Sequence, residues 1–116
     1  VEQVPYSLVW GILSKNTIGV IPFNKTPLTE SCVPTKLFEM MACLDQIVAS
    51  DLPPIRYFVD DSVFWFKPGD YKSLARAIKS SIVLLKDDRK KNKNLNLIST
   101  KYNWDVIENN YLNLFR

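Results

Sequence analysis

The sequence predicts an α/β fold in which a parallel sheet of about three strands is flanked by helices. Three short apolar runs alternate with segments of helical periodicity along the 116 residues. Continuous apolar runs are typical of strands that are buried on both faces. Consecutive parallel strands need a crossover, which a helix usually provides. Because the length suits one domain, we expect residues 1–116 to form a single unit.

The three apolar runs are the expected strands. The first, Thr17–Phe23, reads TIGVIPF and contains no charged residue. The second, Gln46–Ser50, is short and apolar, and the third, Ser62–Pro68, is rich in aromatic residues. Because aromatic side chains favour strands, we interpret Trp65 and Phe66 as strand core rather than as a stacking platform for a base.

Helices are expected before, between and after these strands. The expected helices are Tyr6–Lys15, Pro34–Leu44, Pro54–Asp60, Ser73–Lys86, and two closing helices that start near Asp87 and Asn103. Asp70 and Asn103 are suitable N-cap residues, and Trp104 is interpreted as an anchor of the last helix. In the fourth helix the apolar residues recur at helical spacing and predict a buried face. They are Leu74, Ile78, Ile82 and Leu85.

The composition excludes several classes of protein. The chain has no histidine, which excludes histidine-based triads and zinc sites, and Cys32 and Cys43 lack metal or redox spacing. No apolar run reaches the roughly 18 residues of a membrane span. Free thiols fit a reducing compartment, so we expect a cytoplasmic protein, with a peripheral position at the inner face of the membrane as an alternative. The net charge of +3 suits an anionic ligand such as a diphosphate.

The expected helix Pro34–Leu44 has two distinct faces. A helical wheel assigns one face to packing on the sheet, and this face holds Leu37, Met41 and Leu44. A second stripe at spacings of three and four holds Lys36, Glu39 and Cys43. Glu39 is therefore held on a rigid element, about one turn from the helix start.

The start of this helix is a candidate ligand site. It follows the first strand, and ligands of open parallel sheets bind at the carboxyl ends of the strands. The free N–H groups of Cys32 to Lys36 would point into that crevice and suit a phosphate. The Glu39 carboxylate could accept two sugar hydroxyls, so the site suits a ligand with a phosphate and a ribose. The alternative is that Glu39 is a surface residue that pairs with Lys36.

The segment VPTKLFEMMACLDQIVASDLPPI resembles the donor-binding segment of retaining glycosyltransferases with the GT-B fold, of the family-4 type. That family has a Pro-x-Lys-x-x-Glu-x-Met-Ala run, a Gly-x-Pro turn and a strand that ends in Ala-Ser. The matching residues are Pro34, Lys36, Glu39, Met41, Ala42, Ala49 and Ser50. The runs GVIPF, FKPGDYKSLARAI and KYNWDVIENNYLNLF are similar to further parts of the same domain, so the resemblance covers almost the whole chain.

The resemblance implies a partial Rossmann-like domain, the carboxyl-terminal half of a GT-B donor domain. Its strands would be the fourth, fifth and sixth of the family's sheet. Glu39 would bind the ribose of a nucleotide-diphosphate sugar, and the loop Thr29–Val33 would face the donor sugar and the diphosphate. The implied donor-binding residues are Glu39, Ser31, Cys32, Val33, Thr35 and Lys36. The resemblance implies no metal and no cofactor apart from this substrate, and it assigns no catalytic residue.

The chain departs from the family pattern in three places. The first motif glutamate should fall at Ser31, whereas Glu30 lies one residue early. Leu44 and Gln46 replace the Gly and Pro of the turn, and leucine adopts positive φ only at a cost, so we expect a rebuilt turn. The acceptor domain and the first half of the donor domain have no counterpart here. We therefore interpret the chain as a fragment without transfer activity of its own.

These observations favour one function and leave alternatives. The chain is interpreted as part of a glycosyltransferase of the hexosyltransferase type that transfers a sugar to a glycan or lipid-linked acceptor. Its expected partners are the nucleotide sugar, an N-terminal acceptor domain and a second copy bound through the edge of Thr17–Phe23. The main alternative is a non-catalytic α/β interaction module derived from the same fold. Nucleic acid binding is disfavoured, because Asp87 and Asp88 adjoin the basic run Arg89–Lys93.

Overall fold

The computed structural model describes residues 3–15, 18–43 and 45–116. These residues form an α/β fold with an open parallel sheet of three strands, as the sequence predicts. The strands are β1 (Ile18–Ile21), β2 (Gln46–Ser50) and β3 (Phe64–Phe66), and their order in the sheet is β1-β2-β3. Ile18 pairs with Gln46 at one end of the β1–β2 ladder, and Val48 pairs with Phe64 where β3 begins.

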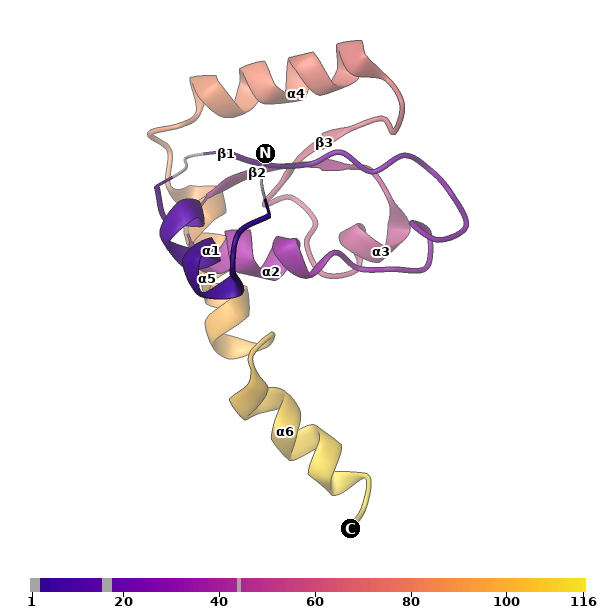
Figure 1. Ribbon diagram of the computed structural model, residues 1–116, viewed down its shortest axis with the longest axis vertical. Coiled ribbons are helices and arrows are strands. Elements are labelled where there is room, and N and C mark those ends of the chain that lie inside the picture. The colour runs from indigo at the N-terminus through magenta and orange to yellow at the C-terminus, as the bar shows by residue number, and fades with distance from the viewer. Residues whose placement is uncertain (1–2, 16–17, 44) are drawn as a thin grey trace.

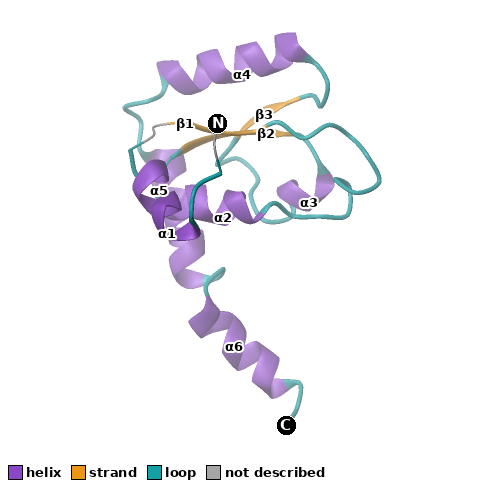
Figure 2. Ribbon diagram, in the orientation of Figure 1, coloured by secondary structure: helices purple, strands orange, loops and turns teal. Residues whose placement is uncertain are grey.

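Helices cover both faces of this sheet. They are α1 (Tyr6–Leu13), α2 (Thr35–Ala42), α3 (Pro53–Arg56), α4 (Tyr71–Val83), α5 (Arg89–Thr100) and α6 (Trp104–Asn113). Figure 1 shows α4 on one face and α2 and α3 on the other, with α5 beside α2. Figure 2 shows the strands as the middle layer between these helices. Helix α6 extends away from the layers and leads to the C-terminus (Figure 1).

The elements are shorter than the sequence predicts, for local reasons. β1 ends at Ile21 because the next residue, Pro22, has no N–H to donate to a ladder. After β3 the chain turns through Gly69, whose φ of 77° favours glycine. The short helix α3 ends at Arg56 rather than Asp60, and the following turn brings the Phe58 ring to 5.2 Å from that of Tyr102.

The predicted helix starts agree well with the structure. An oxygen of Asp70 accepts a hydrogen bond from the N–H of Ser73 at 2.9 Å, and the side-chain oxygen of Asn103 accepts one from Val106 at 3.0 Å. These bonds satisfy N–H groups that the first turns of α4 and α6 leave free. Thr17 and Leu44, which the sequence assigned to a strand and a helix, lie outside the described residues, as does the expected rebuilt turn at Leu44.

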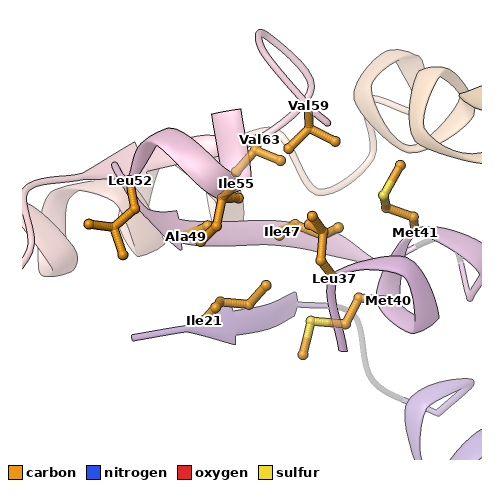
Figure 3. Close-up of a cluster of buried hydrophobic side chains, with 10 residues drawn as sticks. All are labelled: Ile21, Leu37, Met40, Met41, Ile47, Ala49, Leu52, Ile55, Val59 and Val63. Atoms are coloured by element: carbon orange, nitrogen blue, oxygen red, sulfur yellow. The ribbon is translucent and has the colours of Figure 1, made fainter. Parts of the chain in front are cut away.

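The main core lies between the sheet and α2 and α3 (Figure 3). Leu37 and Met41 of α2 are fully buried there, as the helical wheel predicts. They pack with Ile47 of β2 and with Ile55 of α3. Met40 is also buried, which the sequence did not predict. A smaller core on the opposite face holds Val48, Phe66 and Ala77.

Two expectations about helix packing are wrong. Ile82 was expected on the buried face of α4, but its side chain is 55% exposed, whereas Ala77 and Ser81 are buried. Small side chains at these positions let α4 approach the sheet closely. Trp104 was expected to anchor α6, but it is 65% exposed, and α6 has no buried residue. An anchor needs a surface to pack on, and α6 extends away from the sheet (Figure 1).

Gly19 of β1 has a packing role that can be tested. A Cβ at this position would overlap the Met40 sulfur and lie 2.9 Å from Met40 Cγ. We expect Gly19→Ala to lower the free energy of unfolding by about 1 kcal/mol, because Met40 must move within a packed core. In contrast, a Cβ at Gly11 of α1 meets nothing within 4 Å. Gly11→Ala should therefore raise the free energy of unfolding by about 0.5–1 kcal/mol, because alanine has the higher helix propensity. Urea denaturation of both variants decides, and a gain in both would mean that Met40 moves at no cost.

Candidate functional site

The carboxyl ends of the three strands meet at one edge of the sheet, because all three strands are parallel. Pockets formed by the described residues open at this edge. The first, of about 280 Å³, lies between the end of β1 and the start of α2 and is called the α2 pocket. The second, of about 430 Å³, lies between the ends of β2 and β3 and the loop that follows β1, and is called the β2–β3 pocket.

The structure brings two of the implied donor-binding residues into the α2 pocket. Thr35 and Lys36 are exposed and line it together with Pro22 and Phe23 from the end of β1. No side chain of residues 3–15, 18–43 or 45–116 caps the N-terminus of α2, which follows Pro34. The first N–H groups of α2 are therefore available to an acceptor outside the helix.

The remaining implied donor-binding residues lie around this pocket without lining it. The hydroxyl of Ser31 donates to the carbonyl of Pro27 at 2.9 Å, and the neighbouring Cys32 is an exposed free thiol. Val33 is half-buried and packs against the main core. The loop that contains Ser31, Cys32 and Val33 therefore lies beside the α2 pocket. Of the implied donor-binding residues, only Thr35 and Lys36 line the pocket itself.

Glu39 lies in the second turn of α2 and is half-buried. It does not line the α2 pocket or the β2–β3 pocket. The alternative interpretation was that Glu39 pairs with Lys36 at the surface, but this ion pair is absent. Within the described part of the chain, no ion pair or side-chain hydrogen bond involves Glu39. A half-buried carboxylate without a partner is available to a ligand that donates hydrogen bonds.

The loop after β1 is a compact hydrogen-bonded turn. The Thr29 hydroxyl donates to the Asn24 carbonyl at 2.6 Å, and the N–H of Thr26 donates to the Thr29 oxygen at 2.9 Å. The buried Ser50 hydroxyl of β2 lies 2.7 Å from the Phe23 carbonyl and so ties the start of this loop to the sheet. These contacts hold the loop at the carboxyl edge.

The β2–β3 pocket is bordered by an ion pair that the sequence did not reveal. Arg56 of α3 donates to both carboxylate oxygens of Asp51, with Nη2 at 2.9 Å from Oδ2. The guanidinium also lies 4.3 Å from the centre of the Trp65 ring. The hydrogen bonds from Arg56 lower the pKa of Asp51, so this carboxylate stays charged. The only sequence signal was an arginine one turn after the Pro-Pro pair that follows Asp51.

The charges that line the β2–β3 pocket nearly balance. Lys25 pairs with Glu30 at 3.3 Å, and Asp51 is paired with Arg56. The ammonium group of Lys67 forms no hydrogen bond or ion pair within 4 Å among the described residues, but its charge contributes to the lowered pKa of Asp70. The pocket thus holds two ion-paired groups and the ammonium group of Lys67, which suits a polar ligand.

The basic run at the start of α5 is largely neutralised by nearby carboxylates. Arg89 pairs with Asp87 at 2.6 Å, Lys91 pairs with Asp88 at 2.6 Å, and Lys93 pairs with Asp61. Lys90 donates to the carbonyl of Asp61. This arrangement is typical of a solvated helix face.

The described residues contain no group of three or more His, Cys, Asp or Glu side chains that could hold a metal ion. Among the helices of residues 3–15, 18–43 and 45–116, none is both long and apolar enough to cross a membrane. No family model, curated protein or solved structure matches this chain.

Proposed function

We propose that the chain is the carboxyl-terminal part of a donor domain from a retaining GT-B glycosyltransferase and binds a nucleotide-diphosphate sugar beside α2. The observation that carries the proposal is Glu39, a half-buried residue in the second turn of α2 whose carboxylate forms no ion pair or hydrogen bond with the described residues. Ribose hydroxyls are donors that such a carboxylate can accept. The resemblance of the surrounding motif to the family's ribose-binding segment provides the second support.

The remaining groups have complementary roles in this proposal. The uncapped N-terminus of α2 and the ammonium group of Lys36 would bind the diphosphate. Ser31, Cys32 and Val33 would lie toward the donor sugar, and Thr35 would contribute a hydroxyl at the pocket wall. Catalysis in the whole enzyme would be positioning and stabilisation of the leaving diphosphate, without a metal. An acceptor domain would bind and position the second substrate. The free thiols support a cytoplasmic location.

Glu39 should be needed for donor binding. We expect Glu39→Gln and Glu39→Ala each to weaken the binding of UDP or GDP sugars by at least about tenfold, because a charged hydrogen-bond acceptor is lost. The measurement is an NMR titration of the chain, which detects weak complexes. Glu108→Gln on the exposed α6 is the matched control and should leave affinity unchanged. Unaltered binding in both Glu39 variants would contradict the ribose assignment.

The second candidate function is a non-catalytic interaction module. The exposed apolar residues of α6 and its C-terminal end favour it, and these are Trp104, Ile107, Tyr111, Leu114 and Phe115. Exposed apolar surface of this kind marks interaction sites. The same titration separates the two functions, because a module that has lost the donor site would bind no nucleotide sugar at all.

A further inference from the structure

We infer that the outer face of α4 docks on an anionic lipid surface. This face points away from the sheet, because Ala77 and Ser81 on the other side of the helix are buried toward it. Figure 1 shows α4 as the outermost layer on its side of the sheet, with no other described segment beyond it. A flat partner can therefore contact the whole length of the helix, about 20 Å for its 13 residues.

The outer face of α4 would stay open in a larger domain. Helix α4 packs on β3 and β2, whereas β1 forms the opposite edge of the sheet from β3. Strands added beside β1, as the proposed donor domain requires, would lie on the far side from β3. A helix that covers those strands would lie beside α4 in the same layer and would leave its outer face exposed.

This outer face carries a row of cations. Lys72, Arg76 and Lys79 follow one another at spacings of four and three, which places them in one row, and all three are exposed. They are called the α4 row. Helix α4 contains no aspartate or glutamate, and Lys86 adds an exposed cation shortly after its end. Such a row favours a partner that presents many negative charges.

Nearby carboxylates leave the α4 row largely available. Within the described part of the chain, none of its three side chains forms an ion pair or a hydrogen bond. Asp70, before α4, accepts a hydrogen bond from the N–H of Ser73, and the charge of Arg76 contributes to the lowered pKa of Asp70. The carboxylates after α4 pair with cations of α5. The α4 row therefore differs from the neutralised basic run of α5.

Apolar side chains are exposed beside the cations at the C-terminal end of α4. Val83 continues the row four residues after Lys79 and is 75% exposed, and the neighbouring Ile82 is 55% exposed. A hollow of about 480 Å³ on this face is lined by Arg76, Lys79, Ser80, Val83 and Leu84. Cations that bind lipid phosphates beside aliphatic side chains that lie between headgroups are typical of helices at a membrane surface.

An anionic bilayer fits these features better than a nucleic acid does. Proteins that bind single-stranded nucleic acid without sequence preference combine cations with aromatic side chains on which the bases stack. The exposed apolar side chains beside the α4 row, Ile82 and Val83, are aliphatic, and the single aromatic residue of α4, Tyr71, lies outside the row. A bilayer is also flat, which suits contact along the whole helix.

Vesicle sedimentation tests this surface. We expect the chain to bind vesicles of phosphatidylcholine and phosphatidylglycerol in equal parts, and to bind vesicles of phosphatidylcholine alone at least about tenfold more weakly. The triple variant Lys72→Gln/Arg76→Gln/Lys79→Gln should weaken binding to the mixed vesicles at least about tenfold, because each cation near an anionic surface contributes to the affinity.

The matched control removes three exposed cations that lie outside α4. This variant, Lys15→Gln/Lys101→Gln/Arg116→Gln, has the same net charge as the first and should weaken binding by less than about threefold, because salt screens distant charges. Equal losses in the two triple variants would overturn the proposal. Failure of the chain to bind the mixed vesicles, or tighter binding to a single-stranded oligonucleotide than to these vesicles, would also overturn it.

NMR of the unmodified chain provides a readout that does not depend on the variants' stability. Bicelles of the same lipids that contain a nitroxide-labelled lipid should broaden the amide signals of residues 71–86 most strongly. Broadening that is centred on another part of the chain would contradict the assignment to α4. Nucleotide-sugar binding is a separate measurement, so its failure would leave the lipid proposal standing.

Discussion

Leu37→Ala should lower the free energy of unfolding by about 2–5 kcal/mol, a large fraction of the roughly 5–15 kcal/mol that stabilises an ordinary domain. Leu37 of α2 is fully buried in the main core and packs between the helix and the sheet (Figure 3). Truncation removes three carbon atoms from a packed interior, and the surrounding side chains cannot fully close the cavity. Urea denaturation followed by circular dichroism measures the loss, and the slope of the transition should stay unchanged.

The matched control for this substitution is Leu114→Ala. Leu114 follows α6 and is 79% exposed, so its truncation should change stability by less than about 0.5 kcal/mol. Both variants are compared at one protein concentration, because any self-association would make the measured stability depend on concentration. Equal, small effects in the two variants would mean that α2 does not pack against the sheet as described.

Much of the fold could be predicted because local patterns and the fold agree. The continuous apolar runs around Val20 and Val48 predict strands that are covered on both faces, and both strands are present. Parallel strands need a crossover connection, and a helix between consecutive strands provides it. The helices between the strands therefore predicted the parallel sheet, whose order is β1-β2-β3. Asp70 and Asn103 were predictable as N-caps because capping depends only on residues three positions away.

The missed features depend on contacts between residues far apart in the sequence. A helical wheel separates faces of a helix but does not say which neighbour covers each face. Met40 is buried because Gly19, in another element, leaves room for its side chain. Ile82 is exposed because α4 packs through its small residues instead. The Arg56 ion pair with Asp51 depends on how the short helix α3 turns back toward β2.

The candidate site was predictable in position but not in detail. The carboxyl edge follows from topology, and Thr35 and Lys36 lie there in a pocket. Whether Glu39 contributes to a ligand site depends on what approaches α2 from outside, which a helical wheel does not describe. The charges of the β2–β3 pocket come from three separate segments, as Lys25, Asp51 and Lys67 illustrate. No local pattern in the sequence links them.

Asp45 lies between α2 and β2, and its side chain is only 1% exposed. Neither carboxylate oxygen has a hydrogen-bond partner among the residues that the structure describes. Burial disfavours the charged form and raises the pKa of Asp45 to about 6. The pKa of the nearby Cys43 thiol is also raised, first by burial and then by the charges of Asp45 and Glu39.

Asp45→Asn should therefore raise the free energy of unfolding by about 2–3 kcal/mol at pH 7.5, because the variant buries no charge. The folded chain holds the Asp45 proton up to about pH 6, whereas an unfolded aspartate releases it near its ordinary pKa of 3.8. Protonation of Asp45 therefore makes its full contribution to the free energy of unfolding below pH 3.8. This contribution is lost as the pH rises through 6.

The gain from Asp45→Asn should consequently shrink as the pH falls from 7.5 through 6 and should approach zero below pH 3.8, where Asp45 becomes protonated in both states. Urea denaturation of the chain and the variant across this range measures the difference directly. Glu108→Gln, which removes an exposed carboxylate on α6, is the control and should change stability by less than about 0.5 kcal/mol throughout. A gain from Asp45→Asn that is independent of pH, or a loss at pH 7.5, would mean that the Asp45 carboxylate has a partner that stabilises its charge.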